Sequence, residues 1–366
     1  SGSKTVLWII IALIVLAALL LALSFTPVGD EIIAKIRGIS TDDDRGGGSD
    51  KVFTAIGGNI VSGSGEILLE NVGFEAHFVD VGQGDAILLK FPGNVEVMID
   101  GGTTSSGLAD YRTELVGYLN DVVSDDTIEY MIVTHPDTDH YNMLEAVMDA
   151  FVVGEVYYND CDKNTTYSKF QDRVLEELGD EGTAIDADGE TYTVLNTESY
   201  SLTVYAPGYD RFNTGDMTEY DAEESNGMSP FVVVETLNRT LIFTGDATVE
   251  TEEWFMSAYS GSLDVDFIKI GHHGSDTSTS QEFLNFVDPE YCVIMCDDGS
   301  AYEHPSATVM NRLFDKGVVT YRTNRHGNIV LYIDASGDMA FGVEREVPVE
   351  NNTVSGRSDL MLITEG

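Results

Sequence analysis

Hydrophobic and polar positions divide the chain into one long apolar run and a later series of short runs. Val6 to Phe25 are twenty uncharged, mostly apolar residues that follow Lys4, and a helix of that length spans the hydrocarbon core of a bilayer. The basic residue precedes the run and every acidic residue follows it, so the positive-inside tendency places the amino end in the cytoplasm and the rest outside. The pattern predicts one long N-terminal apolar helix, within residues 1–38, that anchors the chain to a membrane.

A filament core is the alternative interpretation of the same helix. The chain begins with Ser1 rather than Met, which fits either an expression-tag remnant or a processed front end. A mature chain that enters a long apolar helix almost at once resembles a type IV pilin-like subunit, in which such helices pack together. Pro27 fits a helix end or a tolerated kink. The expected partner of this helix is therefore either the membrane or identical subunits.

The remainder of the chain has the mixed pattern of an α/β protein. Residues 39–52 are rich in Gly and Asp and predict a flexible linker. Short strand-like runs then alternate with runs of helical period over 53–346, and 347–366 read as a weakly held tail. The expected strands are 76–81, 86–91, 95–99, 130–133, 153–158, 192–195, 202–205, 267–270, 291–296, 318–322, 329–334 and a hairpin over 230–243; the expected helices are 108–119, 143–151, 248–259, 279–286 and 307–316.

The charge balance is strongly acidic and bears on the environment and the partners. Among 366 residues, 63 are acidic and 19 basic, for a net charge of −44. An acidic shell of this kind suits a high-salt medium, in which self-repulsion is screened, and so predicts a halophilic source; a very soluble extracellular protein is the alternative. DNA is a candidate partner that the charge does not favour, because nucleic-acid affinity rests on Lys and Arg.

The cysteines and sequons add little about the compartment. Cys292 and Cys296 lie in one predicted strand, roughly 13 Å apart, which is too far for a disulfide. Cys161 could pair with at most one of them, so we expect three buried thiols. Three glycosylation sequons, at Asn164, Asn238 and Asn351, are consistent with an outside domain.

The candidate chemistry lies where predicted strands end. Residues 134–140 read Thr-His-Pro-Asp-Thr-Asp-His and follow the apolar run 130–133. Buried carboxylates are costly unless they are paired or bound to a cation. Two other strands end similarly, in Gly245-Asp246 and in Gly271-His272-His273-Gly274. A polar turn would explain the first motif alone, but three strand ends that carry metal-type ligands predict one metal site.

These motifs resemble the metallo-β-lactamase superfamily, most closely the extracytoplasmic hydrolase domain of ComEC-type DNA-uptake proteins and its free-standing relatives. Segments 78–86, 98–102, 303–305 and 322–327 support the resemblance, which covers about residues 74–342. It implies an α/β fold, a four-layer αβ/βα sandwich, with the metal site at the strand ends between its halves.

The resemblance also implies a set of six metal ligands. His135, Asp137 and Asp246 would face one ion, and Asp139, His140, Asp246 and His272 the second, so that Asp246 bridges them. Asp100 would orient the histidine loop through hydrogen bonds, as metal-bound imidazoles usually require.

The sequence departs from the superfamily pattern in two places. Asp137 stands where the usual motif has a second histidine, and no histidine occurs between His140 and His272. Asn226 and Ser229 occupy that region instead. Oxygen ligands in place of imidazole favour harder ions, so Mn²⁺ or Mg²⁺ is expected before Zn²⁺, with one or two ions bound.

The expected activity is metal-dependent hydrolysis of phosphate esters at the cell surface, by a phosphodiesterase or nuclease-like enzyme. A bound cation would activate water, and Asp139, His304 and His273 are the candidate catalytic residues. His304 could instead be a structural histidine, as we expect for His77 and His326. The alternative function is a filament subunit whose head keeps the fold, active or not.

Two further features allow more than one interpretation. The turn at residues 82–85 is either plain hairpin geometry or a wall of the site. Lys269 is near the site in sequence, but a solvent-facing strand residue would show the same pattern.

Overall fold

The computed structural model describes residues 72–161, 163–179, 182–185, 189–207, 222–259, 261, 263–298 and 302–345, with the backbone alone at 60–62 and 222–224. The expected apolar helix, linker and tail, and with them the membrane or filament partner, lie outside these residues. Among the helices that are described, none combines the length and apolar character needed to cross a membrane.

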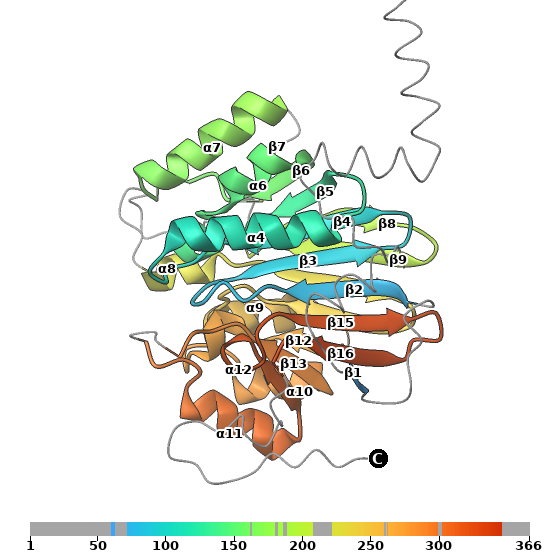
Figure 1. Cartoon of the computed structure of the whole chain (residues 1–366). Coiled ribbons are helices and arrows are strands. Elements are labelled where there is room, and N and C mark those ends of the chain that lie inside the picture. The colour runs from blue at the N-terminus through green and yellow to red at the C-terminus, as the bar shows by residue number, and fades with distance from the viewer. Residues whose placement is uncertain are drawn as a thin grey trace, which may run out of the picture. The chain divides into compact units, whose positions relative to one another are not determined.

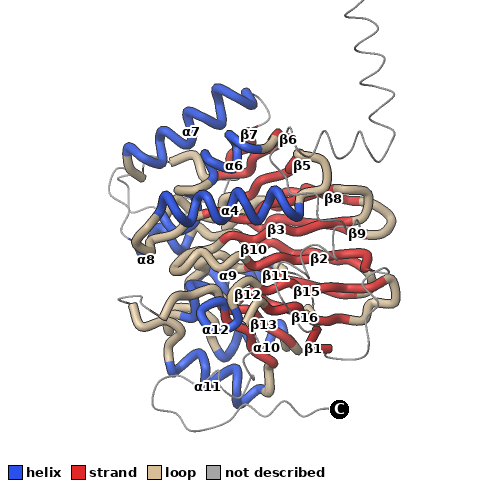
Figure 2. Tube along the Cα trace, in the orientation of Figure 1, coloured by secondary structure: helices blue, strands red, loops and turns tan. Residues whose placement is uncertain are grey.

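Two β-sheets form the centre of the fold (Figures 1 and 2). The first contains, in spatial order, β1 (Ile60–Ser62), β16 (Met339–Val343), β15 (Ile329–Asp334), β2 (Val72–Phe78), β3 (Ala86–Phe91), β4 (Val95–Gly101), β5 (Thr127–Ile132), β6 (Val152–Tyr158) and β7 (Gly182–Ala184). The second contains β14 (Val319–Arg322), β13 (Tyr291–Ile294), β12 (Phe267–Lys269), β11 (Arg239–Phe243), β10 (Phe231–Thr236), β9 (Tyr200–Tyr205) and β8 (Thr191–Asn196).

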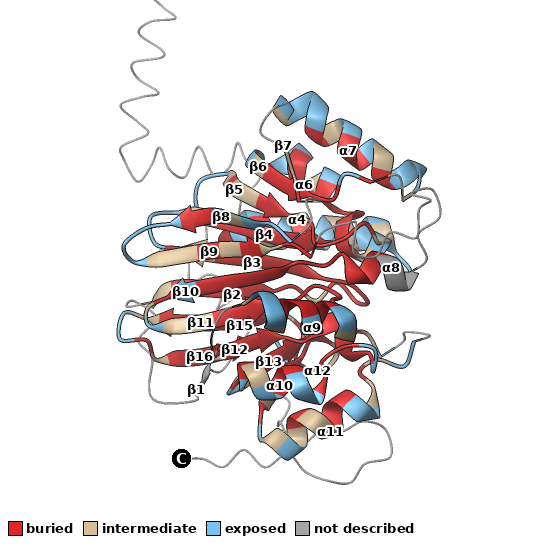
Figure 3. Cartoon of the chain, turned by 180° about the vertical axis from the view of Figure 1, so that it is seen from behind, coloured by how far each residue is buried: buried red, intermediate tan, exposed pale blue. Residues whose placement is uncertain are grey.

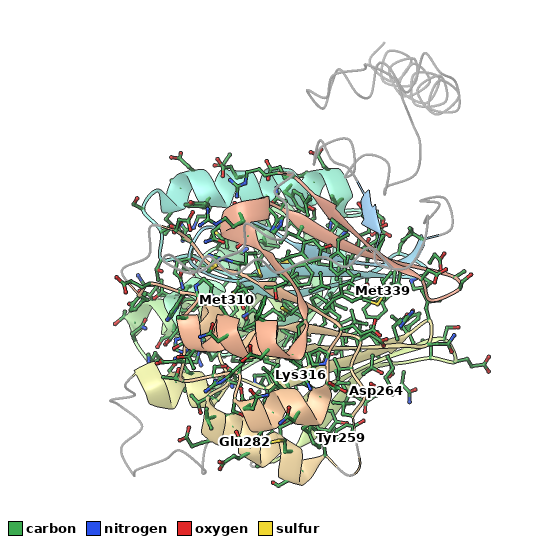
Figure 4. The ribbon with its side chains drawn as sticks, turned by 90° about the horizontal axis from the view of Figure 1, so that it is seen from below. Tyr259, Asp264, Glu282, Met310, Lys316 and Met339 are labelled. Atoms are coloured by element: carbon green, nitrogen blue, oxygen red, sulfur yellow. The ribbon has the colours of Figure 1, made fainter. Side chains whose placement is uncertain are left out.

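Helices cover the outer face of each sheet. On the first sheet lie α4 (Leu108–Val122), α5 (Thr138–Tyr141), α6 (Leu144–Ala150) and α7 (Thr165–Leu178); on the second lie α9 (Val249–Ala258), α10 (Gln281–Val287) and α11 (Ala307–Lys316). The remaining short helices are α8 (Ala222–Gly227), η3 (Gly271–Gly274) and α12 (Thr323–His326). Figure 3 shows exposed stretches on α7, α9, α10 and α11, and strands that are mostly buried, with partly exposed residues in β8 and β9. Figure 4 shows α10 and α11 from below, with Glu282 and Lys316 labelled.

The core between the sheets follows from the two-residue period of the strands. In β2, Phe74, Ala76 and Phe78 face the second sheet, whereas Glu75 and His77 are buried on the opposite, helix-covered side. The ring of Phe78 lies 5.3 Å from that of Phe267 in the second sheet, centroid to centroid. One further core lies between each sheet and the helices that cover it. The layers therefore follow the order helix, sheet, sheet, helix, as we expected for this part of the chain.

The parallel strands of the two sheets determine where a site can form. Strands β4 to β7 run parallel in the first sheet, and β11 to β14 run parallel in the second. Their carboxyl ends therefore gather at one edge of each sheet, which is where α/β proteins bind ligands.

The structure confirms the predicted hairpin and adds elements that the sequence analysis missed. Strands β10 and β11 are joined at Leu237 and Asn238, whose φ angles of 49° and 59° are those of a tight hairpin turn. Helix α7 was not predicted. Its Asn164 side chain caps it by accepting from the Thr166 and Tyr167 N–H groups. Strands β7 and β16 and helices α5, α8 and α12 were also missed.

The three cysteines are buried thiols without disulfide bonds, as expected. Burial raises the pKa of Cys292 to about 12 and that of Cys296 to about 11. Both thiols are therefore protonated and unreactive at neutral pH.

Gly117, on the exposed side of α4, offers a test of the helix assignment. A Cβ atom at this position would meet nothing within 4 Å, and Gly costs a helix interior about 0.5–1 kcal/mol relative to Ala. Gly117→Ala should therefore stabilise the protein by about that amount in urea unfolding. As a control, Gly154→Ala should destabilise it, because the new Cβ would lie 2.5 Å from the Glu129 carbonyl oxygen. A Gly117→Ala protein no more stable than the parent would contradict the prediction.

Candidate metal centre

The centre forms where four parallel strands from two sheets end. Asp100 lies near the end of β4, and the histidine motif of residues 134–140 follows β5. Asp246 follows β11, and the Gly271–Gly274 turn follows β12. The three segments that the sequence analysis singled out therefore meet at one place.

Asp246 lies in the middle of the imidazoles. Its Oδ2 atom is 3.4 Å from Nε2 of His140 and 3.4 Å from Nε2 of His273, and 3.8 Å from Nε2 of His272. Burial raises the pKa of Asp246, but the charges of His273 and His140 outweigh burial and hold that pKa well below its usual value. Asp246 is thus a buried carboxylate at neutral pH.

Three sets of three side chains at this centre bring ligand atoms within 4.8 Å of one another. They are His135, His140 and Asp246; Asp139, His140 and His273; and Asp85, Asp100 and His140. The Nε2 atoms of all three of these histidines are buried and have no hydrogen-bond partner among the described residues. Buried polar atoms normally have partners. A cation would provide one, so the residues present fit a metal ion.

Hydrogen bonds on the far side of each ring set its orientation. Asp100 accepts the Nδ1–H group of His140 at 2.8 Å and also accepts from the Thr134 backbone N–H and hydroxyl at 2.8 and 2.7 Å. The expected orienting role of Asp100 is confirmed. His273 Nδ1 donates to the Met295 carbonyl at 2.9 Å. Both rings therefore turn Nε2 toward the centre.

The carboxylates of the centre raise the pKa of two of its imidazoles. Burial lowers the pKa of His273, yet Asp246 and Asp139 outweigh burial and raise it to about 10. The pKa of His140 is also raised, because the charges of Asp246 and Asp100 outweigh the effect of burial. A divalent ion would replace the protons that these carboxylates attract.

Two of the six expected ligands lie at the margin of the centre. Asp137 accepts from Ser225 Oγ at 2.7 Å and pairs with Lys163 at 3.1 Å. His272 Nε2 accepts from the Asn226 amide at 3.2 Å. Within the described residues, neither Asp137 nor His272 belongs to a set of three ligand atoms.

The Gly271–Gly274 turn decides which histidine faces inward. His272 and His273 have φ angles of 46° and 52°, and this turn buries His273 while the His272 side chain stays 22% exposed. His273 therefore lies deeper in the centre than His272, although both Nε2 atoms are near Asp246 Oδ2. The ligand roles of Asp137 and His272 stay predictions.

A buried ion pair between Asp85 and Lys269 lies behind the centre. Both side chains are fully buried, and Lys269 Nζ also donates to the Gly245 carbonyl at 3.1 Å. Asp85 Oδ1 is 3.4 Å from His273 Nδ1. The turn at residues 82–85 is therefore a wall of the site, and Lys269 faces the site rather than solvent. The acidic residue directly before an apolar strand was the available signal for Asp85.

His304 lies at the rim of the centre. Its ring centroid is 5.4 Å from that of His272 and 6.3 Å from that of His273. Burial, followed by the two neighbouring imidazoles, lowers its pKa to about 4. His77 pairs with Glu75, and His326 accepts from the Arg322 N–H, which is consistent with structural roles for both.

Gly102 offers a test of how the histidine loop is held. A Cβ at Gly102 would lie 2.3 Å from the Asp139 carbonyl carbon and 2.4 Å from the His140 nitrogen. Gly102→Ala must therefore displace α5. We expect it to destabilise the protein by about 1–3 kcal/mol and to weaken metal binding by roughly tenfold or more, measured by urea unfolding and calorimetric titration. Gly117→Ala is the matched control; equal metal affinity in both variants would contradict the prediction.

Comparison with known proteins identifies the class. The family model of the metallo-beta-lactamase superfamily matches residues 79–296, and the chain belongs to that superfamily.

Among individual relatives, ComE operon protein 3 of Bacillus subtilis (strain 168) is 26% identical over 269 residues, which cover 70% of this chain and 32% of the relative. Competence protein ComA of Neisseria gonorrhoeae is 27% identical over 270 residues, which cover 73% and 32%. The chain thus matches about a third of the length of these relatives. The solved structure of CmlA, a diiron beta-hydroxylase from Streptomyces venezuelae, aligns with a TM-score of 0.44 and 16% identity over 71% of this chain and 54% of that one. Superfamily membership and the donor set together support divalent metal binding.

Proposed function

We propose that this chain is a metal-dependent hydrolase of phosphate esters that is displayed at the cell surface. One observation carries the proposal: the unpartnered Nε2 atoms of His135, His140 and His273 converge with the carboxylates of Asp139 and Asp246. The apolar run near the amino end and the competence-protein relatives support surface display. The same apolar run supports the filament alternative, and electron microscopy of shed surface material separates the two.

The donor set narrows the choice among Mn²⁺, Mg²⁺ and Zn²⁺. Three imidazoles suit Mn²⁺ or Zn²⁺ better than Mg²⁺, which prefers oxygen ligands. All three sets of ligand atoms at the centre include His140, whose Nδ1 is already bonded to Asp100. Because one imidazole nitrogen binds one ion, the geometry supports one well-held ion more directly than two.

The protein's own groups would position the attacking water. When bound, the divalent ion supplies Lewis acidity that lowers the pKa of water and polarises a phosphoryl oxygen. Asp139 is partly exposed, and its Oδ2 is 3.4 Å from His273 Nε2. Burial raises the pKa of Asp139, but His273 and His140 outweigh it and lower the pKa to about 2. Asp139 is therefore ionised at neutral pH and can accept a hydrogen bond from the attacking water.

His273 and His304 have different roles in the proposed reaction. His273 is buried and bonded to Met295, so it holds position rather than moving a proton. His304 is half-buried at the rim and neutral at pH 7, since its pKa is lowered to about 4. We assign His304 to hydrogen bonding with the phosphate group. A small or surface-linked phosphodiester fits the acidic protein better than DNA, since the net charge of −44 repels a polyanion.

A diester assay with defined metals tests the proposal. We expect hydrolysis of bis(p-nitrophenyl) phosphate that requires Mn²⁺ or Zn²⁺, is lost with a chelator and returns when metal is restored. Asp139→Asn should lower kcat by roughly a hundredfold or more. The control is Asp149→Asn. Asp149 is an exposed carboxylate on α6 that pairs with Arg173 on α7. No turnover with any of the three metals would refute the enzymatic proposal.

A further inference from the structure

A second group of carboxylates lies at the other end of the first sheet. Glu96 is near the start of β4, Glu129 is near the start of β5, and Asp125 is in the turn between α4 and β5. We name these three residues the basal carboxylate cluster. Glu96 and Asp100 lie on one strand, four residues and therefore roughly 13 Å apart. The cluster is thus separate from the metal centre described above.

The three side chains converge closely. One carboxylate oxygen from each lies within 4.8 Å of the other two. Glu129 Oε2 accepts from the Glu96 backbone N–H at 2.8 Å, which fixes the two strands at this point. Asp125 is exposed to solvent, so an ion could reach the cluster from its side.

Glu96 is the unusual member of the cluster. Glu96 is fully buried, with 0% of its surface exposed. One oxygen, Oε1, accepts from the Ser124 N–H at 3.1 Å and the Ser124 hydroxyl at 2.7 Å. The other oxygen, Oε2, is buried and has no hydrogen-bond partner within the described part of the chain. A buried carboxylate oxygen without a partner is costly, and it is the kind of atom that a cation stabilises.

Lys90, the nearby basic residue, does not neutralise the negative charge of the cluster. Lys90 lies opposite Glu96 on β3, and its Nζ donates to the Val122 carbonyl oxygen. One lysine beside three carboxylates leaves the cluster with two negative charges. Burial raises the pKa of Glu96, and the charge of Glu129 raises it further. The Ser124 hydrogen bonds and the charge of Lys90 act in the opposite direction but do not cancel the increase.

We propose that the basal carboxylate cluster binds one hard divalent cation of the calcium type. Its ligands are oxygen atoms only, which Ca²⁺ prefers and which distinguishes this site from the imidazole-rich centre. The ion joins the turn after α4 to the starts of β4 and β5. It thereby stabilises the first sheet at the end opposite the metal centre, and its role is structural whether or not the protein is a hydrolase.

Thermal unfolding of the full chain with CaCl₂ at constant ionic strength tests this proposal. Ca²⁺ should raise the unfolding midpoint by roughly 5 °C when its concentration is about a hundredfold above the Kd. The shift should disappear in Glu96→Gln and in Asp125→Asn; the latter changes an exposed side chain and so should leave folding intact. Asp121→Asn is the matched control, because it removes an exposed carboxylate from α4 that lies outside the cluster.

The same experiment must distinguish Ca²⁺ binding at the basal carboxylate cluster from Ca²⁺ binding at the metal centre. The Ca²⁺ shift should persist in Asp246→Asn, which alters only the first centre. A shift that survives Asp125→Asn, that is lost in Asp121→Asn, or that vanishes in Asp246→Asn would overturn the proposal. The absence of any Ca²⁺-dependent shift in the unaltered protein would overturn it as well.

Discussion

Replacing Asp246 with asparagine is expected to abolish tight divalent-metal binding and any hydrolysis that depends on it. The Asp246 carboxylate lies 3.4 Å from two Nε2 atoms and is one of three ligands in the set with His135 and His140. Asparagine keeps the size of the side chain but not its charge. Loss of a group that only orients a ligand already costs roughly 10–100-fold in affinity, so loss of the ligand should cost at least about a hundredfold.

Metal content and calorimetric titration of the purified protein measure this effect. The same variant should lower the pKa of His140 and of His273, because each loses the carboxylate charge that raises it. Asp266→Asn is the control, since Asp266 pairs with Arg239 at the opposite end of β12. Unchanged metal content in Asp246→Asn, or an equal loss in Asp266→Asn, would show that the centre does not depend on Asp246.

Lys269→Met should produce the largest loss of stability. Lys269 and Asp85 form a fully buried ion pair, and removal of one partner leaves the other charge buried and uncompensated. Such a change costs about 3–5 kcal/mol. Adding Asp85→Asn should restore part of the loss, with a coupling of about 1–3 kcal/mol. Urea unfolding of the two single variants and the double variant measures it; simple additivity would contradict the ion-pair account.

The same pair predicts a pH dependence. Burial raises the pKa of Asp85, but Lys269, followed by His273, outweighs burial and holds the pKa below its usual value. A lowered carboxyl pKa contributes stability that is present above the unfolded pKa of about 4 and is lost on further acidification. Lys269→Met removes this contribution, so the difference in stability between parent and variant should shrink as the pH falls through the acid range.

Much of the metal centre could be predicted because its residues lie next to strands. A buried strand must be apolar, so a change from apolar residues to His, Asp and Gly marks the strand end. This change was visible before His135, Asp246 and His272, and parallel strands bring such ends together. Asp100 was placed through the family resemblance, and its three hydrogen bonds confirm the orienting role.

Other features could not be predicted, because they depend on contacts between distant segments. A turn with two residues of positive φ brings both His272 and His273 near Asp246, and it buries His273 while His272 stays partly exposed. One oxygen of Asp137 is paired with Lys163 and Ser225, while the other lies 3.8 Å from His135 Nε2. Helix α7 was missed although its buried apolar residues, Tyr167, Phe170 and Val174, have helical spacing; its polar composition concealed the pattern.

By itself, the sequence determined the fold class, the acidic character of the protein and the three segments that form the centre. These properties follow from local composition and from the periods of strands and helices, which are encoded along the chain. Only the tertiary structure decided which ligand atoms converge, that Asp85 and Lys269 are buried against each other, and that Glu96 shares a cluster with Asp125 and Glu129. The reason is geometric: side chains at strand ends acquire neighbours only when the sheets are assembled.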